Sequence, residues 1–126
     1  MSINYTIDGV QVVAEPNDTI LTSATRAGVE IPTLCFDART AIYGACGICL
    51  IEVEGVPKLL RACSARPQEG YVVHTDTPRV NRARSIALEL LMSDHTGDCR
   101  GPCKLNCPAM TDCQKYVGEI DRKSVV

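Results

Sequence analysis

The chain has 126 residues and a formal net charge of −2, with no long run of one charge sign, so nucleic acid and membrane surfaces have little support as partners. Its apolar runs are too short to span a bilayer, which argues against direct membrane insertion. The length allows one ordinary domain, or one small domain with an extension. Because the sequence has four Tyr, one Phe and no Trp, aromatic side chains supply little cohesion, and metal ligation can contribute folding energy in their place.

Residues 2–15 predict a β-hairpin. Apolar and polar residues alternate over 3–7, which places the apolar ones on one face of a strand. Asp8-Gly9 is a strong tight-turn signal, and residues 10–13 return as the second strand.

A short helix is expected after the hairpin. Asp18 or Thr19 supplies its N-cap, and Gly28 supplies its stop. The apolar residues between them follow helical spacing, namely Ile20, Leu21, Ala24 and Ala27.

Residues 31–48 form an irregular segment in this interpretation, because Gly and Pro punctuate it. Strands are expected over 49–54, near 58–63 and over 71–75. This order of elements indicates an α+β domain in which a sheet packs across a helix: two strands come first, then a helix, a long loop and further strands.

A second helix is expected from Thr77-Pro78 to about Ser93, because Thr suits the cap and Pro suits the first turn. Its apolar residues share one face, namely Val80, Ala83, Ala87, Leu90 and Leu91. Three arginines lie elsewhere on the helix and are interpreted as its solvated face, with docking of a partner as the alternative, namely Arg79, Arg82 and Arg84. We therefore expect a domain over residues 1–78, and a helix with an irregular cysteine-rich segment over residues 79–126.

Eight cysteines fall into two unlike groups, and the first group has gaps of ten, two and thirteen residues. Its members are Cys35, Cys46, Cys49 and Cys63. Four thiolates on glycine-rich backbone suit an iron–sulfur cluster, because glycine permits turns that aim N–H groups at the sulfurs. The first group is therefore a candidate cluster site.

Three other interpretations of these cysteines stay open. Disulfides suit small secreted domains, but the N-terminal residues do not have the pattern of a signal peptide. Structural zinc usually takes paired short knuckles, whereas this group has one short pair. A thioredoxin-like redox pair has the spacing of Cys46 and Cys49, and it leaves Cys35 and Cys63 without a role.

Residues 1–78 resemble the β-grasp 2Fe–2S ferredoxin domain, and the gaps match those at the N-terminus of the large peripheral subunit of respiratory complex I. Iron-only hydrogenases and NAD-linked formate dehydrogenases share this module. The resemblance implies that Cys35, Cys46, Cys49 and Cys63 bind a 2Fe–2S cluster. It continues through residues 85–95, which look like the segment before the His-Cys cluster of those proteins.

The second group comprises Cys99, Cys103, Cys107 and Cys113, with His95 ahead of it. The family binds a 4Fe–4S cluster with one His and three Cys, but here Cys103 is an addition that disturbs the middle gap. The stretch from Cys103 to Pro108 is similar to the N-terminal iron–sulfur segment of the glutamate synthase small subunit and related flavoproteins. The preferred assignment is one 4Fe–4S cluster on the four cysteines. Three alternatives stay open. His95 can replace one of the cysteines as a ligand, His95 can be a helix C-cap, or the site can be incomplete.

The resemblances imply an electron-transfer subunit. It relays single electrons between a flavin- or NAD(P)H-linked subunit and a catalytic partner such as a hydrogenase or formate dehydrogenase. The sequence has no nucleotide-binding fingerprint, so we expect a non-catalytic subunit rather than a catalytic oxidoreductase, in the cytoplasm. A structural zinc-binding interaction module is the alternative function. We assign no chemistry to His74, or to Glu52 and Glu54, which alternate along an exposed strand face.

Overall fold

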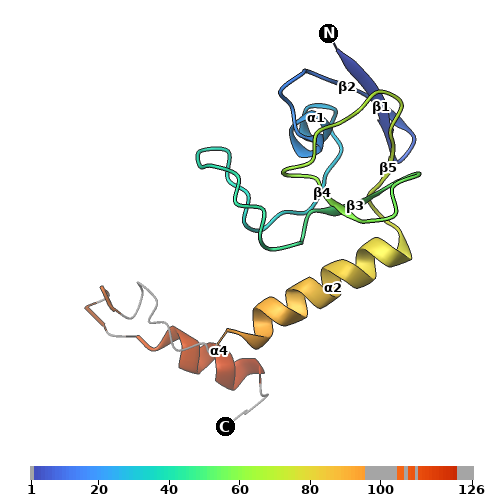
Figure 1. The fold of residues 1–126 in the computed structure, drawn as a ribbon. Helices are drawn as coiled ribbons and strands as arrows, with labels where there is room; N and C mark the ends of the chain where they lie inside the picture. Colours follow the sequence, from blue (N-terminus) through green and yellow to red (C-terminus); the bar gives the residue numbers. More distant parts are fainter. Residues whose placement is uncertain (1, 96–104, 107, 110, 122–126) are drawn as a thin grey trace. The chain divides into compact units, whose positions relative to one another are not determined.

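The computed structural model describes residues 2–95, 105, 106, 108, 109 and 111–121. The chain divides into two units, Met1–Asp94 and His95–Val126 (Figure 1). None of the helices in these described ranges combines the length and apolar character needed to cross a bilayer.

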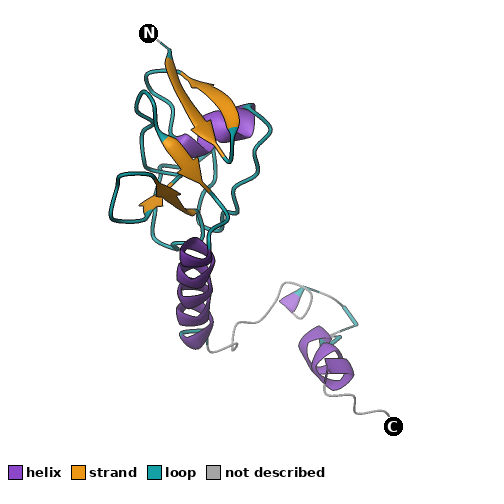
Figure 2. Cartoon of the chain, turned by 90° about the vertical axis from the view of Figure 1, so that its right-hand side faces the viewer, coloured by secondary structure: helices purple, strands orange, loops and turns teal. Residues whose placement is uncertain are grey.

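A five-stranded mixed sheet organises the first unit, in the spatial order β2-β1-β5-β3-β4. Figure 2 draws strands of this unit in orange. The strands are β1 Ile3–Ile7, β2 Val10–Ala14, β3 Leu50–Val53, β4 Leu60–Arg61 and β5 Val72–His74. The β1–β5 pair is parallel, and the other three pairs are antiparallel. This arrangement confirms the α+β fold class.

The hairpin of β1 and β2 forms where the alternation and the Asp8-Gly9 turn predict it. Both turn residues have positive φ, +48° at Asp8 and +82° at Gly9, as the favoured hairpin turns require. One face of the hairpin is buried, including Tyr5 and Val12. Burial of that face fixes the register, because a slip of one residue would turn the buried set to solvent.

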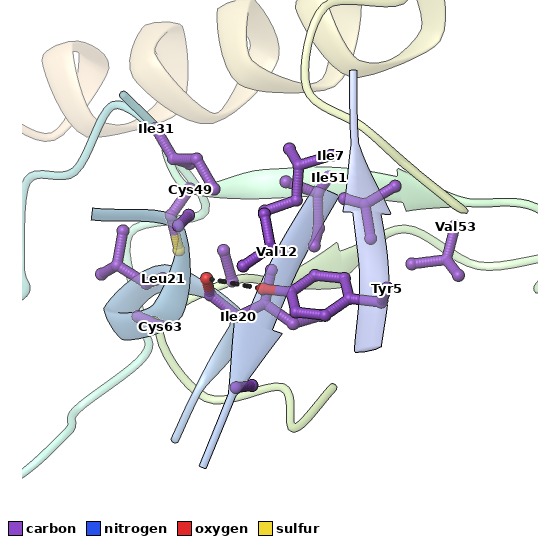
Figure 3. Packing of buried hydrophobic residues seen from close by; sticks show 14 residues of the cluster. Tyr5, Ile7, Val12, Ile20, Leu21, Ile31, Cys49, Ile51, Val53 and Cys63 are labelled. Atoms are coloured by element: carbon purple, nitrogen blue, oxygen red, sulfur yellow. Dashed lines mark hydrogen bonds between the residues drawn. The ribbon is translucent and has the colours of Figure 1, made fainter. Parts of the chain in front are cut away.

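Helix α1 (Ile20–Arg26) packs its apolar face on the sheet. Thr19 is the N-cap, and it exchanges hydrogen bonds with Thr22 in a capping box. The Tyr5 ring fills the space between sheet and helix, and its hydroxyl donates to the Ile20 carbonyl at 3.5 Å (Figure 3). The same hydroxyl lies 2.6 Å from Ser23 Oγ. Two of the candidate ligands, Cys49 and Cys63, belong to this core.

Helix α2 (Pro78–Ser93) begins at the Thr77 cap, as predicted. Glu52 on β3 anchors this end, because its carboxylate accepts hydrogen bonds from Thr77 Oγ1 at 2.8 Å and from Arg79 at 3.0 Å. Val80 is fully buried, whereas Leu90 is 65% exposed. The first unit therefore covers only the start of the expected apolar face, and Figure 2 shows the helix extending away from the sheet.

Helix α4 (Cys113–Asp121) is the main described element of the second unit. An irregular segment is expected there from the sequence, so this helix is a difference from expectation. Its single Gly, at position 118, lowers helix propensity, which weakens the signal in the sequence.

Candidate metal centre

The four cysteines of the first group come from three segments that the sheet brings together. Cys35 lies in the loop after α1, Cys46 and Cys49 precede β3, and Cys63 follows β4. Three of the thiols are nearly dry, with exposed fractions of 9% at Cys46, 2% at Cys49 and 1% at Cys63. Cys35 is half-buried, and all four are free thiols.

Backbone hydrogen bonds hold the segment of Cys63 against its neighbours. The Ala62 N–H donates to the Cys49 carbonyl at 3.0 Å, which fixes Cys49 and Cys63 on adjacent segments. The first N–H groups of α1, which have no partner within the helix, donate to the carbonyls of Ala62 and Ala65 at 2.9 Å each. The helix cap and the cysteine loop therefore stabilise each other.

Cys35 and Cys46 form the first pair of thiols. The Cys35 sulfur accepts hydrogen bonds from the Cys46 N–H, the Cys46 thiol and the N–H groups of Ala45 and Gly44, and these lower the pKa of Cys35 below its ordinary value. Successive N–H groups that converge in this way form an anion-binding concavity. The segment therefore stabilises a thiolate at Cys35.

Gly44 and Gly47 give this segment its shape. Their φ values are +65° and +73°, in the left-handed region that only glycine adopts without strain. At Gly47 an added Cβ would lie 3.3 Å from the Ala87 Cβ of α2. Gly47 therefore also permits the close approach of α2 to the cysteine loop.

Cys49 and Cys63 form the second pair. Burial raises the pKa of Cys63 to about 11, and a hydrogen bond with Cys49 and the charges of Cys49, Cys35 and Cys46 act in the same direction. Mutual repulsion of this kind arises when several thiolates share a small volume. A bound metal would remove it, because ligation replaces the protons.

The pairing agrees with a binuclear centre. Among the described residues, no group of three or more Cys, His, Asp or Glu side chains is arranged to hold a metal ion. A 2Fe–2S cluster has two irons, each held by two of the four protein ligands, and the two pairs of thiols fit that division. Such a cluster fits the buried thiols, the N–H groups that donate to the Cys35 sulfur, and the left-handed glycines Gly44 and Gly47 that shape the loop.

Arg84 is a neighbour of this site that the sequence pattern misplaces on a solvated face. Its Nη2 donates to the Leu50 carbonyl at 2.7 Å, and its Nε is shielded from solvent without a hydrogen-bond partner among the described residues. Burial lowers the pKa of Arg84, and Cys49 is the first of the charges that oppose this shift. The spacing of Val80, Arg84 and Ala87 at i, i+4 and i+7 could have revealed the error, because it puts all three on one helix face.

The second group is described only in part. Cys99, Cys103 and Cys107 lie outside the described residues. Cys113 is half-buried at the first residue of α4. His95 is exposed, and the C-cap of α2 is Asp94, so His95 lies one residue beyond the cap.

The fold and the paired thiols define a ferredoxin-type iron–sulfur domain. Residues 1–78 match the 2Fe-2S iron-sulfur cluster binding domain family, and the chain belongs to this family.

Relatives identify the larger proteins in which such a domain occurs. The chain is 41% identical over 97 residues to the NADH-ubiquinone oxidoreductase 78 kDa subunit, mitochondrial, of Candida albicans, covering 77% of this chain and 14% of the relative. A subunit of the NADH-quinone oxidoreductase of Rickettsia bellii is 40% identical with the same coverage. The corresponding 78 kDa subunit of Neurospora crassa is 36% identical over 125 residues, 95% of this chain and 16% of the relative. The resemblance to the complex I subunit is thus confirmed.

A solved structure extends the comparison. An NAD+-reducing [NiFe]-hydrogenase in the H2-reduced state has a chain that superposes with a TM-score of 0.69 and 25% identity, covering 100% of this chain and 51% of that one. The resemblance of the second group to glutamate synthase stays a prediction.

Proposed function

We propose that Cys35, Cys46, Cys49 and Cys63 bind a 2Fe–2S cluster, with Cys35 and Cys46 on one iron and Cys49 and Cys63 on the other. The observation that carries this proposal is the arrangement of four buried or half-buried free thiols in two pairs. The family match over residues 1–78 supports the choice of cluster.

The protein's own groups then have defined roles. The N–H groups of residues 44–46 stabilise the thiolate of Cys35, and the surrounding core excludes water from Cys49 and Cys63. When bound, the cluster supplies a one-electron carrier, and centres of the plant type lie near about −400 mV. Hydrogen bonds to sulfur and burial set the value for this chain.

A 4Fe–4S cluster on Cys99, Cys103, Cys107 and Cys113 completes the proposal, with His95 as the alternative ligand. The support is the cysteine spacing and the match to the Neurospora relative, which covers 95% of the chain and so extends past residue 78. We keep the division into a 2Fe–2S domain over 1–78 and a cluster-binding segment over 79–126 as part of this proposal.

The chain acts, in this proposal, as an electron relay within a multi-subunit redox complex. It spans 14–16% of the length of the Candida, Rickettsia and Neurospora relatives, whose names describe NADH–quinone and NADH–ubiquinone oxidoreductases. The proposed partners are a flavin- or NAD(P)H-linked subunit and a catalytic redox subunit. The chain itself is non-catalytic and cytoplasmic in this view. The five cysteines that the structure describes are free thiols, which suits a reducing compartment.

Metal and sulfide analysis of the anaerobically purified chain tests the proposal. The two clusters together predict about six iron and about six sulfide per chain. NADH oxidation by the isolated chain should be absent. A colourless protein with stoichiometric zinc and no sulfide would contradict the proposal and favour a structural zinc module.

A further inference from the structure

Arg84 places a half-buried positive charge beside the first cysteine group, and one of its hydrogen-bond donors has no partner among the described residues. Its Nη2 holds the Leu50 carbonyl at 2.7 Å, and Leu50 directly follows Cys49 in the chain. Its Nε is shielded from solvent and has no partner among the described residues. The Nε–H is therefore a donor for which the described part of the protein supplies no acceptor.

The Nε–H of Arg84 is expected to have a hydrogen-bond acceptor, because it is shielded from solvent. Buried polar groups in native proteins are almost always hydrogen-bonded, and an unsatisfied donor costs about 1–3 kcal/mol. Cys49 is the group whose negative charge acts most strongly on Arg84, ahead of Asp76 and Asp8. The negative charge that a bound cluster adds at Cys49 would therefore act on Arg84 as well.

The packing of α2 holds Arg84 in place. Val80, one turn before Arg84, is fully buried, and Ala87, one turn after it, meets the cysteine loop at Gly47. The helix start is tied to β3 through Glu52. A charge on this face is therefore kept at a fixed depth beside the site, unlike a charge on a freely moving surface side chain.

We propose that Arg84 raises the reduction potential of the 2Fe–2S cluster. This inference rests on the proposed function of the four cysteines. Reduction adds one electron to the cluster and breaks no bond, so the cluster and its thiolates become more negative by one charge. A nearby guanidinium and its Nε–H stabilise the reduced state more than the oxidised state, because attraction grows with the negative charge. Arg84 is a positioning and tuning residue in this account, and α2 is the element that places it.

The test is a redox titration of the whole anaerobic chain, with dithionite as the electron source and the reduced 2Fe–2S signal in electron paramagnetic resonance (EPR) as the readout. Arg84→Gln removes the half-buried charge. Arg82→Gln removes an equal charge from an exposed position on the same helix, where solvent and salt screen it. At the wild-type midpoint, the ratio of reduced to oxidised cluster should fall at least tenfold in Arg84→Gln, which is about 59 mV for one electron. It should change less than about threefold in Arg82→Gln, because the screened charge acts weakly.

Equal midpoints in the two variants would overturn the inference, because a role limited to holding Leu50 does not move the potential. If Arg84→Gln fails to retain its cluster, the pair Arg84→Lys and Arg82→Lys replaces it. Lysine keeps the charge and lacks the Nε–H of arginine, so Arg84→Lys should titrate at lower potential than Arg82→Lys, and equal values contradict the inference. Absence of any 2Fe–2S signal in the wild-type chain would refute the proposed function instead.

Discussion

Replacement of Gly47 by Ala tests whether α2 packs on the cysteine loop as the structure shows. Gly47 has a φ of +73°, and left-handed backbone costs a residue with a Cβ about 1–2 kcal/mol. The new Cβ would also lie 3.3 Å from the Ala87 Cβ and 3.9 Å from Leu50 Cδ1. Overpacking of this kind adds about 1–3 kcal/mol, so the total is about 2–5 kcal/mol.

Gly55→Ala is the matched control. Gly55 has a φ of +78°, and nothing lies within 4 Å of an added Cβ there, so this variant carries the backbone cost alone. With about 4–8 °C per kcal/mol for a domain of this size, Gly47→Ala should melt at least about 4 °C below Gly55→Ala.

The assay is thermal unfolding of the anaerobic chain, followed by circular dichroism at one scan rate, because loss of a cofactor can make unfolding irreversible. Ala87→Gly, introduced into the wild type and into the Gly47→Ala variant, completes a double-mutant cycle. The double variant should recover part of the loss attributed to the Ala87 contact. Equal melting of Gly47→Ala and Gly55→Ala, together with zero coupling in the cycle, would refute the packing argument.

Three further predictions concern the core and the second cysteine group. Thr19→Ala removes the cap of α1 and should lower stability by about 1 kcal/mol, seen as a lower thermal midpoint; an unchanged midpoint contradicts the role of the capping box. Tyr5→Phe removes the 2.6 Å contact with Ser23 and should lower stability by about 1–2 kcal/mol near neutral pH. Burial raises the pKa of Tyr5 above 10.0, so its contribution is complete below about pH 10 and is lost as pH rises through the folded-state pKa. Denaturant midpoints of wild type and Tyr5→Phe should therefore converge at high pH, and a constant gap would argue against this linkage. His95→Ala should keep about six iron per chain if four cysteines hold the second cluster, whereas a loss of about four iron would identify His95 as a ligand.

The parts of the fold that the sequence predicts well are those that depend on local sequence signals. The Asp8-Gly9 turn and the Thr77-Pro78 helix start depend on residues adjacent in the chain, and such preferences act whatever the rest of the fold does. The spacing of the first cysteine group and a family resemblance also predict its four members as ligands, and this assignment stays a prediction.

The sequence leaves the environment of those cysteines undetermined. The N–H groups of residues 44–46 reach Cys35 across a loop whose path depends on the whole sheet. Arg84 shows the same limit, because three arginines on a helix suggest a solvated face, and only the packing of α2 against Gly47 places Arg84 beside Cys49. Tertiary contact decides both features. The spacing of Val80, Arg84 and Ala87 indicates which helix face Arg84 shares, but it does not indicate what packs against that face.

The EPR spectrum of the reduced, anaerobically purified chain tests the central claim most directly. A 2Fe–2S signal is expected in the wild type, with its loss or distortion in Ser variants of each of Cys35, Cys46, Cys49 and Cys63. Cys113→Ser, in the second unit, should leave that signal unchanged. No 2Fe–2S signal in the wild type, or an unaltered signal in the Cys49→Ser variant, would contradict the assignment of these four thiols as ligands.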